Sequence, residues 1–275
     1  MPRVSGSPIE QTIQSRVLQK PMRLFLYLPP YYGEFKMRYP VVYLLHPWNR
    51  NERYFEERLG LKEVADRLIY AGVLPPFVAV MPQGDKSFFI NAANPGGDFS
   101  MVVQFDPKFF EGALEGFGDY GDYILDDVLP AIERHYEVRT DRAGRVIAGI
   151  SMGGAGAAVL AFTNPDLFGG VGIHSPALFT SQRLGPPWIF GLADEEAFAR
   201  RDPIHLAQHL DPRSELRIYL DCGQEDELAE PAALLHRVLE ERGIQHTYIS
   251  RPGGHNGEYW RAHFPEYLGF YAAGW

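Results

Sequence analysis

The sequence predicts an α/β protein in which helices cover both faces of a mostly parallel sheet. Short apolar runs rich in branched and aromatic residues recur along the 275-residue chain, and stretches with helical spacing separate several of them. Strands that alternate with helices form parallel sheets that are buried on both faces. A content of 45% hydrophobic and 22% charged residues is that of an ordinary folded chain.

Seven apolar runs are expected to be the strands of this sheet. They lie at residues 22–28, 41–45, 77–81, 145–150, 170–173, 216–220 and 246–249. Apolar residues recur at helical spacing in five other stretches, at 55–70, 120–136, 155–162, 197–210 and 228–242. Turn residues support these boundaries, because Gly243 follows the last helix as a C-terminal glycine would and Asn164-Pro165 stops the third helix.

Residues 1–275 are expected to form a single domain, because no repeat, low-complexity tract or linker divides the chain. Two irregular segments interrupt the pattern, near residues 84–121 and 175–194. Irregular segments of this length in a folded domain are usually functional walls or lids. We therefore expect both segments to shape a pocket.

Charge and cysteine content bear on partners and location. Lys plus Arg number 26 against 35 Asp plus Glu, a formal net charge of −9, and no basic run offers phosphates a compensating patch. We expect neither nucleic acid nor a membrane as a partner. The single cysteine, Cys222, cannot form an internal disulfide, and the first residues hold no apolar stretch suited to a secretion signal. These observations favour a cytoplasmic location.

The apolar run 145–150 leads directly into a G-x-S-x-G motif centred on Ser151, with small residues after it. This is the pattern of a nucleophile elbow, a strained turn between a strand and a helix that exposes a serine hydroxyl at the sheet edge. Gly149 and Gly153 are expected there because Cβ atoms would keep the strand and the helix apart. Glycine-rich turns also bind phosphate, so the elbow alone does not decide the function.

A serine nucleophile needs a histidine to take its proton and an acid to orient that histidine, in the chain order serine, acid, histidine. The run 216–220 opens into a turn that contains Asp226, and the run 246–249 leads into a glycine loop that contains His255. Both turns lie at the sheet edge where ligands bind. We therefore expect His255 as the base and Asp226 as the acid. The alternatives for the acid share its turn: Asp221, Glu225 and Glu227.

Other histidines fit these roles less well. His135, His236 and His246 lie within or beside expected helices and strands, where a structural histidine is the default. His205 and His209 have the i, i+4 spacing of a helical metal site, but the residues between them lack the glutamate that zinc hydrolysis requires. We expect no metal and no other cofactor.

Several further motifs follow one another in a fixed order along nearly the whole chain. They are residues 24–32 (LFLYLPPYY), 39–46 (YPVVYLLH), 149–154 (GISMGG) and 164–168 (NPDLF), Ser175-Pro176, the D-x-G-x-x-D of Asp221, Gly223 and Asp226, and Gly253-Gly254-His255 followed by Tyr259-Trp260. In this order they resemble the esterase D family of α/β-hydrolases, also called the "Putative esterase" family. Feruloyl esterases, S-formylglutathione hydrolases and mycolyltransferases belong to it.

The resemblance implies an α/β-hydrolase fold and supports Ser151, Asp226 and His255 as a catalytic triad. It also implies that the backbone amide of Met152 donates to the oxyanion. A second donor normally follows a Leu-Leu-His-Gly strand, but this chain has His46-Pro47-Trp48 there. Proline has no N–H, so we expect the amide of Trp48 to be the second donor and its indole to form a pocket wall.

The sequence therefore predicts a serine esterase that hydrolyses carboxylic esters through an acyl-enzyme. Trp48, Phe179 and Trp188 are expected to line a pocket for a short-chain or aromatic acyl group. The expected partner is a small-molecule ester, and a homo-oligomer stays open. An acyltransferase, or a thioesterase similar to S-formylglutathione hydrolase, could use the same triad. A non-catalytic binding module is a more distant alternative.

Overall fold

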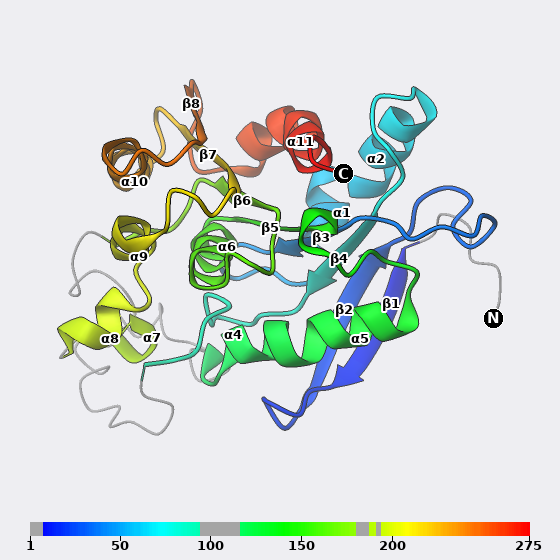
Figure 1. Cartoon of the computed structure of the whole chain (residues 1–275), viewed down its shortest axis with the longest axis horizontal. Helices are drawn as coiled ribbons and strands as arrows, with labels where there is room; N and C mark the ends of the chain where they lie inside the picture. The colour runs from blue at the N-terminus through cyan, green and yellow to red at the C-terminus, as the bar shows by residue number, and fades with distance from the viewer. Residues whose placement is uncertain (1–7, 94–115, 180–186, 191–193) are drawn as a thin grey trace.

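The computed structural model describes residues 8–93, 116–179, 187–190 and 194–275 (Figure 1). In this part of the chain, one sheet has the strand order β1-β2-β4-β3-β5-β6-β7-β8. β2 runs antiparallel to β1 and β4, and the remaining neighbours are parallel. The strands are β1 (Ile9–Gln14), β2 (Pro21–Tyr27), β3 (Val41–Leu45), β4 (Val78–Pro82), β5 (Arg145–Ile150), β6 (Gly170–His174), β7 (Arg217–Gly223) and β8 (Thr247–Arg251).

Helices cover both faces of the sheet, as the sequence predicts. On one face, Val42 and Leu44 of β3 share a core with α1 (Tyr54–Leu59), α2 (Leu61–Tyr70) and α11 (Gly257–Ala272). On the other face, Val41, Tyr43 and Leu45 share a core with a second group of helices. This group comprises α5 (Leu129–His135), α6 (Met152–Thr163), α9 (Pro203–His209) and α10 (Ala229–Glu241). Figure 1 shows α11 and α5 on opposite sides of the sheet.

Two expected helices are each divided into two. The stretch 55–70 breaks at Gly60, whose φ of 66° is left-handed and ends α1 before α2 begins. The stretch 197–210 divides into α8 (Glu195–Ala199) and α9, because Asp202 caps α9 and Pro203 occupies its first turn. The stretch 120–136 is helical up to His135, as α4 (Tyr120–Asp122), a π-helical turn (Tyr123–Val128) and α5.

Among the described residues, a strand and a long helix were not expected, nor were two short helical turns, α7 (Pro187–Phe190) and a 3-10 turn (Arg142–Gly144). β1 is an edge strand whose side chains alternate between half-buried and exposed, a period-two pattern too weakly apolar to stand out. α11 carries aromatic residues on several faces and Pro265 in its interior, which hide the helical period. The signal that could have found α11 is Asn256, whose side chain accepts from the amides of Glu258 and Tyr259.

Parallel pairing aligns the carboxyl ends of the central strands. Ile150 at the end of β5 pairs with His174 at the end of β6, and His174 pairs with Asp221 in β7. The loops that leave these strands therefore emerge at one edge of the sheet, where ligands of α/β proteins bind.

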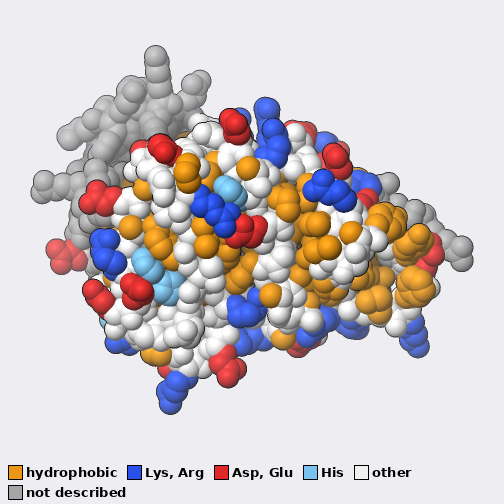
Figure 2. Space-filling model, turned by 90° about the horizontal axis from the view of Figure 1, so that it is seen from above, with side chains coloured by type: hydrophobic (Ala, Val, Ile, Leu, Met, Phe, Trp, Pro, Cys, Tyr) orange, Lys and Arg blue, Asp and Glu red, His pale blue; other side chains and the backbone are white. Residues whose placement is uncertain are grey.

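The surface over α2, α10 and α11 carries basic, acidic and apolar side chains interspersed with one another (Figure 2). Large exposed apolar residues occur beyond β2 and around the end of α2: Tyr31, Phe35, Met37, Tyr70 and Val73. Among the described helices, none is long and apolar enough to cross a membrane.

Candidate active site

Ser151 sits in the turn between β5 and α6, with φ of 57° and ψ of −115°. A left-handed φ is costly for a residue with a Cβ, and the surroundings hold it in place. The Ser151 amide donates to the carbonyl of His174 at 2.8 Å, and its carbonyl accepts from the Ala177 amide at 3.0 Å. A Cβ on Gly149 would collide with the backbone of Gly153, and one on Gly153 would collide with the backbone of Leu45. The elbow therefore requires both glycines.

The structure brings Ser151, His255 and Asp226 together from three separate loops. His255 Nε2 lies 2.9 Å from Ser151 Oγ. On the other side of the ring, Nδ1 lies 2.9 Å and 3.1 Å from the two carboxylate oxygens of Asp226. A proton on Nδ1 that is donated to Asp226 leaves Nε2 free to accept the serine proton.

The environment of Asp226 keeps this carboxyl group ionised. Burial by itself would raise its pKa, but hydrogen bonds from His255 and the Leu228 amide outweigh burial, so its pKa is lowered. Of the other acids of this region, Glu225 accepts from the Gly253 amide and Asp221 lies in β7. Glu227 is exposed and lies near the pair, but the Nδ1 atom of His255 is hydrogen-bonded to Asp226.

Trp260 and Ser175 contact members of the triad. The rings of Trp260 and His255 pack nearly perpendicular to each other, with 5.0 Å between centroids, and the Nε1–H of Trp260 donates to Ser175 Oγ at 3.0 Å. A hydrogen bond from Ser175 also lowers the pKa of Asp226. Both residues occur in the motifs of the sequence resemblance, but a role for them emerges only from the folded arrangement.

Cys222 is buried at the end of β7, beside Asp226. Burial and the neighbouring carboxylate raise the pKa of its thiol. A protonated, buried thiol is a poor nucleophile, so the sulfur does not compete with Ser151.

The loop after β3 is anchored by a buried histidine. His46 Nδ1–H donates to the Pro47 carbonyl at 3.0 Å, and Nε2 accepts from the Gly84 amide at 3.0 Å. Burial lowers the pKa of His46 to about 4, which keeps the ring neutral. Trp48 follows and packs against Phe88 with 5.6 Å between ring centroids.

Neutral His46 makes stability depend on pH. Unfolding restores the ordinary pKa of 6.5, so below that pH the unfolded chain binds a proton that the folded chain refuses, until pH falls below about 4. The contribution of neutral His46 to the free energy of unfolding is therefore fully present above pH 6.5 and is lost as pH falls towards about 4. We expect His46→Asn to reduce the loss of unfolding free energy between pH 7 and pH 5 by about 2 kcal/mol. Urea unfolding of both proteins at the two pH values measures this difference. Equal losses in both proteins would contradict a neutral, buried His46.

A pocket of about 530 Å³ opens beside the serine and the histidine. It is lined by Pro47, Trp48, Arg50, Tyr54, Arg58, Ser151, His255, Asn256, Gly257, Glu258, Trp260 and Arg261. The structure thus places Trp48 in the same pocket as Ser151. Phe179 does not line this pocket; it packs against Phe88 and Phe190. The side chain of Trp188 lies outside the described residues, as do positions 94–115, 180–186 and 191–193 of the expected pocket-forming segments.

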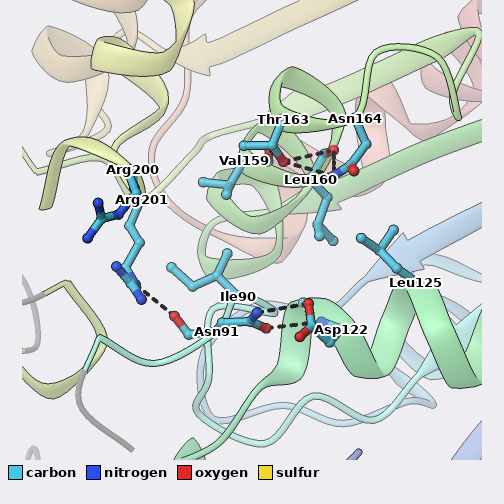
Figure 3. A pocket seen from close by; sticks show the side chains of 11 residues that line it. Ile90, Asn91, Asp122, Leu125, Val159, Leu160, Thr163, Asn164, Arg200 and Arg201 are labelled. Carbon is cyan, nitrogen blue, oxygen red and sulfur yellow. Dashed lines mark hydrogen bonds between the residues drawn. The ribbon is translucent and has the colours of Figure 1, made fainter. Parts of the chain in front are cut away.

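A second pocket, of about 280 Å³, lies beside the C-terminal half of α6 (Figure 3). Part of the expected pocket-forming segment 84–121 lines it. Asn91 donates to the carboxylate of Asp122 at 2.8 Å, and Arg201 donates to the Asn91 carbonyl at 2.7 Å. None of the three triad residues lines this pocket.

Metal ligation has one candidate group among the described residues. Asp226, Glu227 and His255 place ligand atoms within 4.8 Å of one another. Asp226 and His255 are already hydrogen-bonded to each other, which accounts for their proximity. The helical pair His205 and His209 is joined by a bond from the His209 ring to the His205 carbonyl, 3.0 Å long.

A parallel sheet with an elbow serine that is hydrogen-bonded to a histidine defines the class of serine hydrolases with an α/β-hydrolase fold. The sequence profile of the "Putative esterase" family matches residues 15–271. The chain therefore belongs to this family of esterases. The expected fold class and family are thereby confirmed.

Individual relatives agree with this assignment. The chain is 28% identical over 200 residues to an endo-1,4-beta-xylanase/feruloyl esterase of Xylanibacter ruminicola, a match that covers 70% of this chain and 25% of that protein. The chain thus spans about a quarter of the length of that relative. A ferulic acid esterase structure superposes with a TM-score of 0.81 at 23% identity, over 98% of this chain and 99% of the other. The structure of an S-formylglutathione hydrolase from Agrobacterium tumefaciens superposes with a TM-score of 0.77 at 18% identity, over 98% of this chain and 96% of the other.

Proposed function

We propose that the protein hydrolyses carboxylic esters of short-chain or aromatic acids, with Ser151, His255 and Asp226 as its catalytic triad. The observation that carries this proposal is the continuous chain of hydrogen bonds from Ser151 Oγ through His255 to Asp226, which ends beside an open pocket. The aromatic preference is supported by Trp48 beside Phe88, and by relatives whose names include feruloyl or ferulic acid esterase.

Acylation follows from this geometry. Ser151 Oγ forms a bond to the ester carbonyl carbon while His255 Nε2 takes the hydroxyl proton. Asp226 stabilises the resulting imidazolium. The bond from the carbonyl carbon to the alcohol oxygen then breaks, and His255 gives its proton to that oxygen.

Deacylation repeats these steps with water. His255 takes a proton from water as the water oxygen bonds to the acyl carbon. The bond to Ser151 Oγ breaks, and His255 returns the proton to the serine. The products are one carboxylic acid and one alcohol.

The oxyanion donors in this proposal are the amides of Met152 and Trp48. Met152 begins α6, and the first N–H groups of a helix have no acceptor within the helix. Trp48 lines the same pocket as Ser151. Donors aimed at a developing negative charge are worth about a hundredfold or more each in turnover.

Hydrolysis of p-nitrophenyl acetate, butyrate and octanoate, together with methyl ferulate, tests the activity and the acyl preference at once. We expect turnover of the acetate and the ferulate to exceed that of the octanoate. Failure to hydrolyse any of the four would contradict the proposed function.

The variant Trp48→Ala tests the indole as a pocket wall separately from the backbone amide as an oxyanion donor, because the variant keeps that amide. We expect this change to raise activity on longer esters relative to acetate, while turnover on acetate stays within about a hundredfold of wild type. Trp48→Phe, which retains a ring, is the matched control and should change the profile less. An acyl-length profile that Trp48→Ala leaves unchanged would show that the indole does not border the acyl site.

A further inference from the structure

The pocket beside Ser151 and His255 has a basic wall. Arg50 comes from the loop after β3, Arg58 from the last turn of α1 and Arg261 from α11. Against these three guanidinium groups, the pocket lining contains one carboxylate, Glu258. The wall is thus positively charged in a chain whose formal net charge is −9.

These arginines differ from others in the molecule. Arg23 pairs with Glu52 at 2.8 Å, and Arg251 pairs with Glu266 at 2.7 Å. Among the described residues, no carboxylate lies within the 4.0 Å of an ion pair from Arg50, Arg58 or Arg261. Arg261 Nε instead donates to the backbone carbonyl of Arg58 at 2.8 Å, a bond that joins α11 to the last turn of α1.

The three guanidinium groups also act on one hydroxyl. Tyr54 lines the pocket, and burial raises its pKa to about 12. Arg50, Arg58 and Arg261 oppose that rise, and no carboxylate contributes to it. The positive charges therefore converge on one part of the pocket.

The position of the basic wall indicates which part of an ester substrate it would contact. In the proposed mechanism His255 Nε2 gives a proton to the departing alcohol oxygen, so the alcohol lies next to His255. The pocket continues from His255 along the residues that follow it, Asn256 to Arg261, and across to Arg58. Trp48 also lines the pocket, and its indole packs against Phe88, which in turn contacts Phe179 and Phe190.

We propose that the preferred substrates are esters whose alcohol carries an anionic group, a carboxylate or a phosphate, which binds to Arg50, Arg58 and Arg261. This inference rests on the proposed esterase function. Guanidinium groups match the geometry of both anions and donate two parallel hydrogen bonds to either. Because the arginines are exposed, dissolved salt weakens the attraction.

Three acetate esters that differ in the alcohol test the proposal: 4-acetoxybenzoate, 4-acetoxyphenyl phosphate and the neutral 4-acetoxybenzamide. Each kcat/KM is divided by the rate constant for hydrolysis by hydroxide, which removes differences in intrinsic reactivity. We expect at least one anionic ester to exceed the amide by about tenfold or more, the effect of hydrogen bonds to a charged group. The larger of the two ratios distinguishes carboxylate from phosphate. Raising NaCl from about 0.05 M to about 0.5 M should reduce the ratio.

Variants tie this preference to the wall. We expect Arg58→Gln and Arg261→Gln each to lower the ratio of anionic to neutral ester by about threefold or more, the range of an exposed charge interaction. Arg237→Gln, an exposed arginine of α10 outside the pocket, is the matched control and should leave the ratio unchanged. A ratio that neither pocket variant lowers would overturn the proposal.

Other outcomes separate this inference from the esterase function. Equal hydrolysis of all three acetates would overturn the anionic preference and leave the esterase intact. A preference for phenyl hydrogen succinate over phenyl succinamate, without a preference among the acetates, would overturn the assignment to the alcohol side. Hydrolysis of none of these esters would overturn the proposed function and this inference with it.

Discussion

Replacing Ser151 by alanine is expected to reduce ester hydrolysis by about 10⁵- to 10⁶-fold, the loss typical of a removed nucleophile. Without Oγ no acyl-enzyme forms, although the pocket and the imidazole remain. The free energy of unfolding should change by about 1 kcal/mol or less, because the hydroxyl contacts the site and contributes little to either core. Steady-state kinetics and urea unfolding measure the two quantities.

Covalent labelling distinguishes a nucleophile from a residue that only shapes the site. Phenylmethanesulfonyl fluoride should add one sulfonyl group to the wild-type protein at Ser151 and none to Ser151→Ala, as intact mass and peptide mapping would show. Ser250→Ala, an exposed serine in β8, is the matched control and should keep full activity. Turnover of Ser151→Ala within tenfold of wild type would refute the assignment.

The second large effect is expected at the acid. Asp226→Asn should lower kcat/KM by about 10³- to 10⁴-fold, because an amide neither stabilises the imidazolium nor fixes the proton on Nδ1. An asparagine that donates to Nδ1 would move the ring proton to Nε2. The Nε2 atom could then no longer accept the proton of serine. The lowered pKa of Asp226 means that this group does not titrate near neutral pH. An activity profile from pH 6 to pH 8 should therefore not follow its ionisation.

Asp221 provides a contrasting carboxylate, five residues earlier in the chain. It is fully buried and accepts from Tyr267 at 2.6 Å and Tyr259 at 3.0 Å, while its second oxygen lies 2.6 Å from His174 Nδ1. We expect Asp221→Asn to lower the free energy of unfolding by about 3 kcal/mol or more, the cost of breaking a buried pair. Per folded molecule, its turnover should fall far less than that of Asp226→Asn.

Glu225→Gln is the control within the same turn and should stay within about tenfold of wild type, since Glu225 bonds to a backbone amide rather than to His255. If Asp221→Asn remained folded and lost more turnover than Asp226→Asn, the acid would be Asp221. The three variants together decide which carboxylate of this region orients the histidine.

Local patterns predicted most of the sheet. All seven expected strands are present, with ends that differ by no more than three residues, because strands buried on both faces read as continuous apolar runs. The elbow could also be predicted from the sequence, because β5, α6 and β3 pass so close to one another that its two glycines are required. Edge strand β1 and aromatic helix α11 lack such clear periods, and the sequence alone did not separate α1 from α2 at Gly60.

The sequence by itself determined the sheet, the elbow and the order of the candidate serine, acid and histidine. Only the tertiary structure decided that Asp226 rather than Asp221 faces His255, that Trp260 and Ser175 support this pair, and that Phe179 packs away from the pocket. It also gathered Arg50, Arg58 and Arg261 in the lining of the pocket beside Ser151. The physical reason is that helix and strand periods arise from neighbours along the chain, whereas a site depends on distances between loops. Those distances are set by the packing of helices on both faces of the sheet.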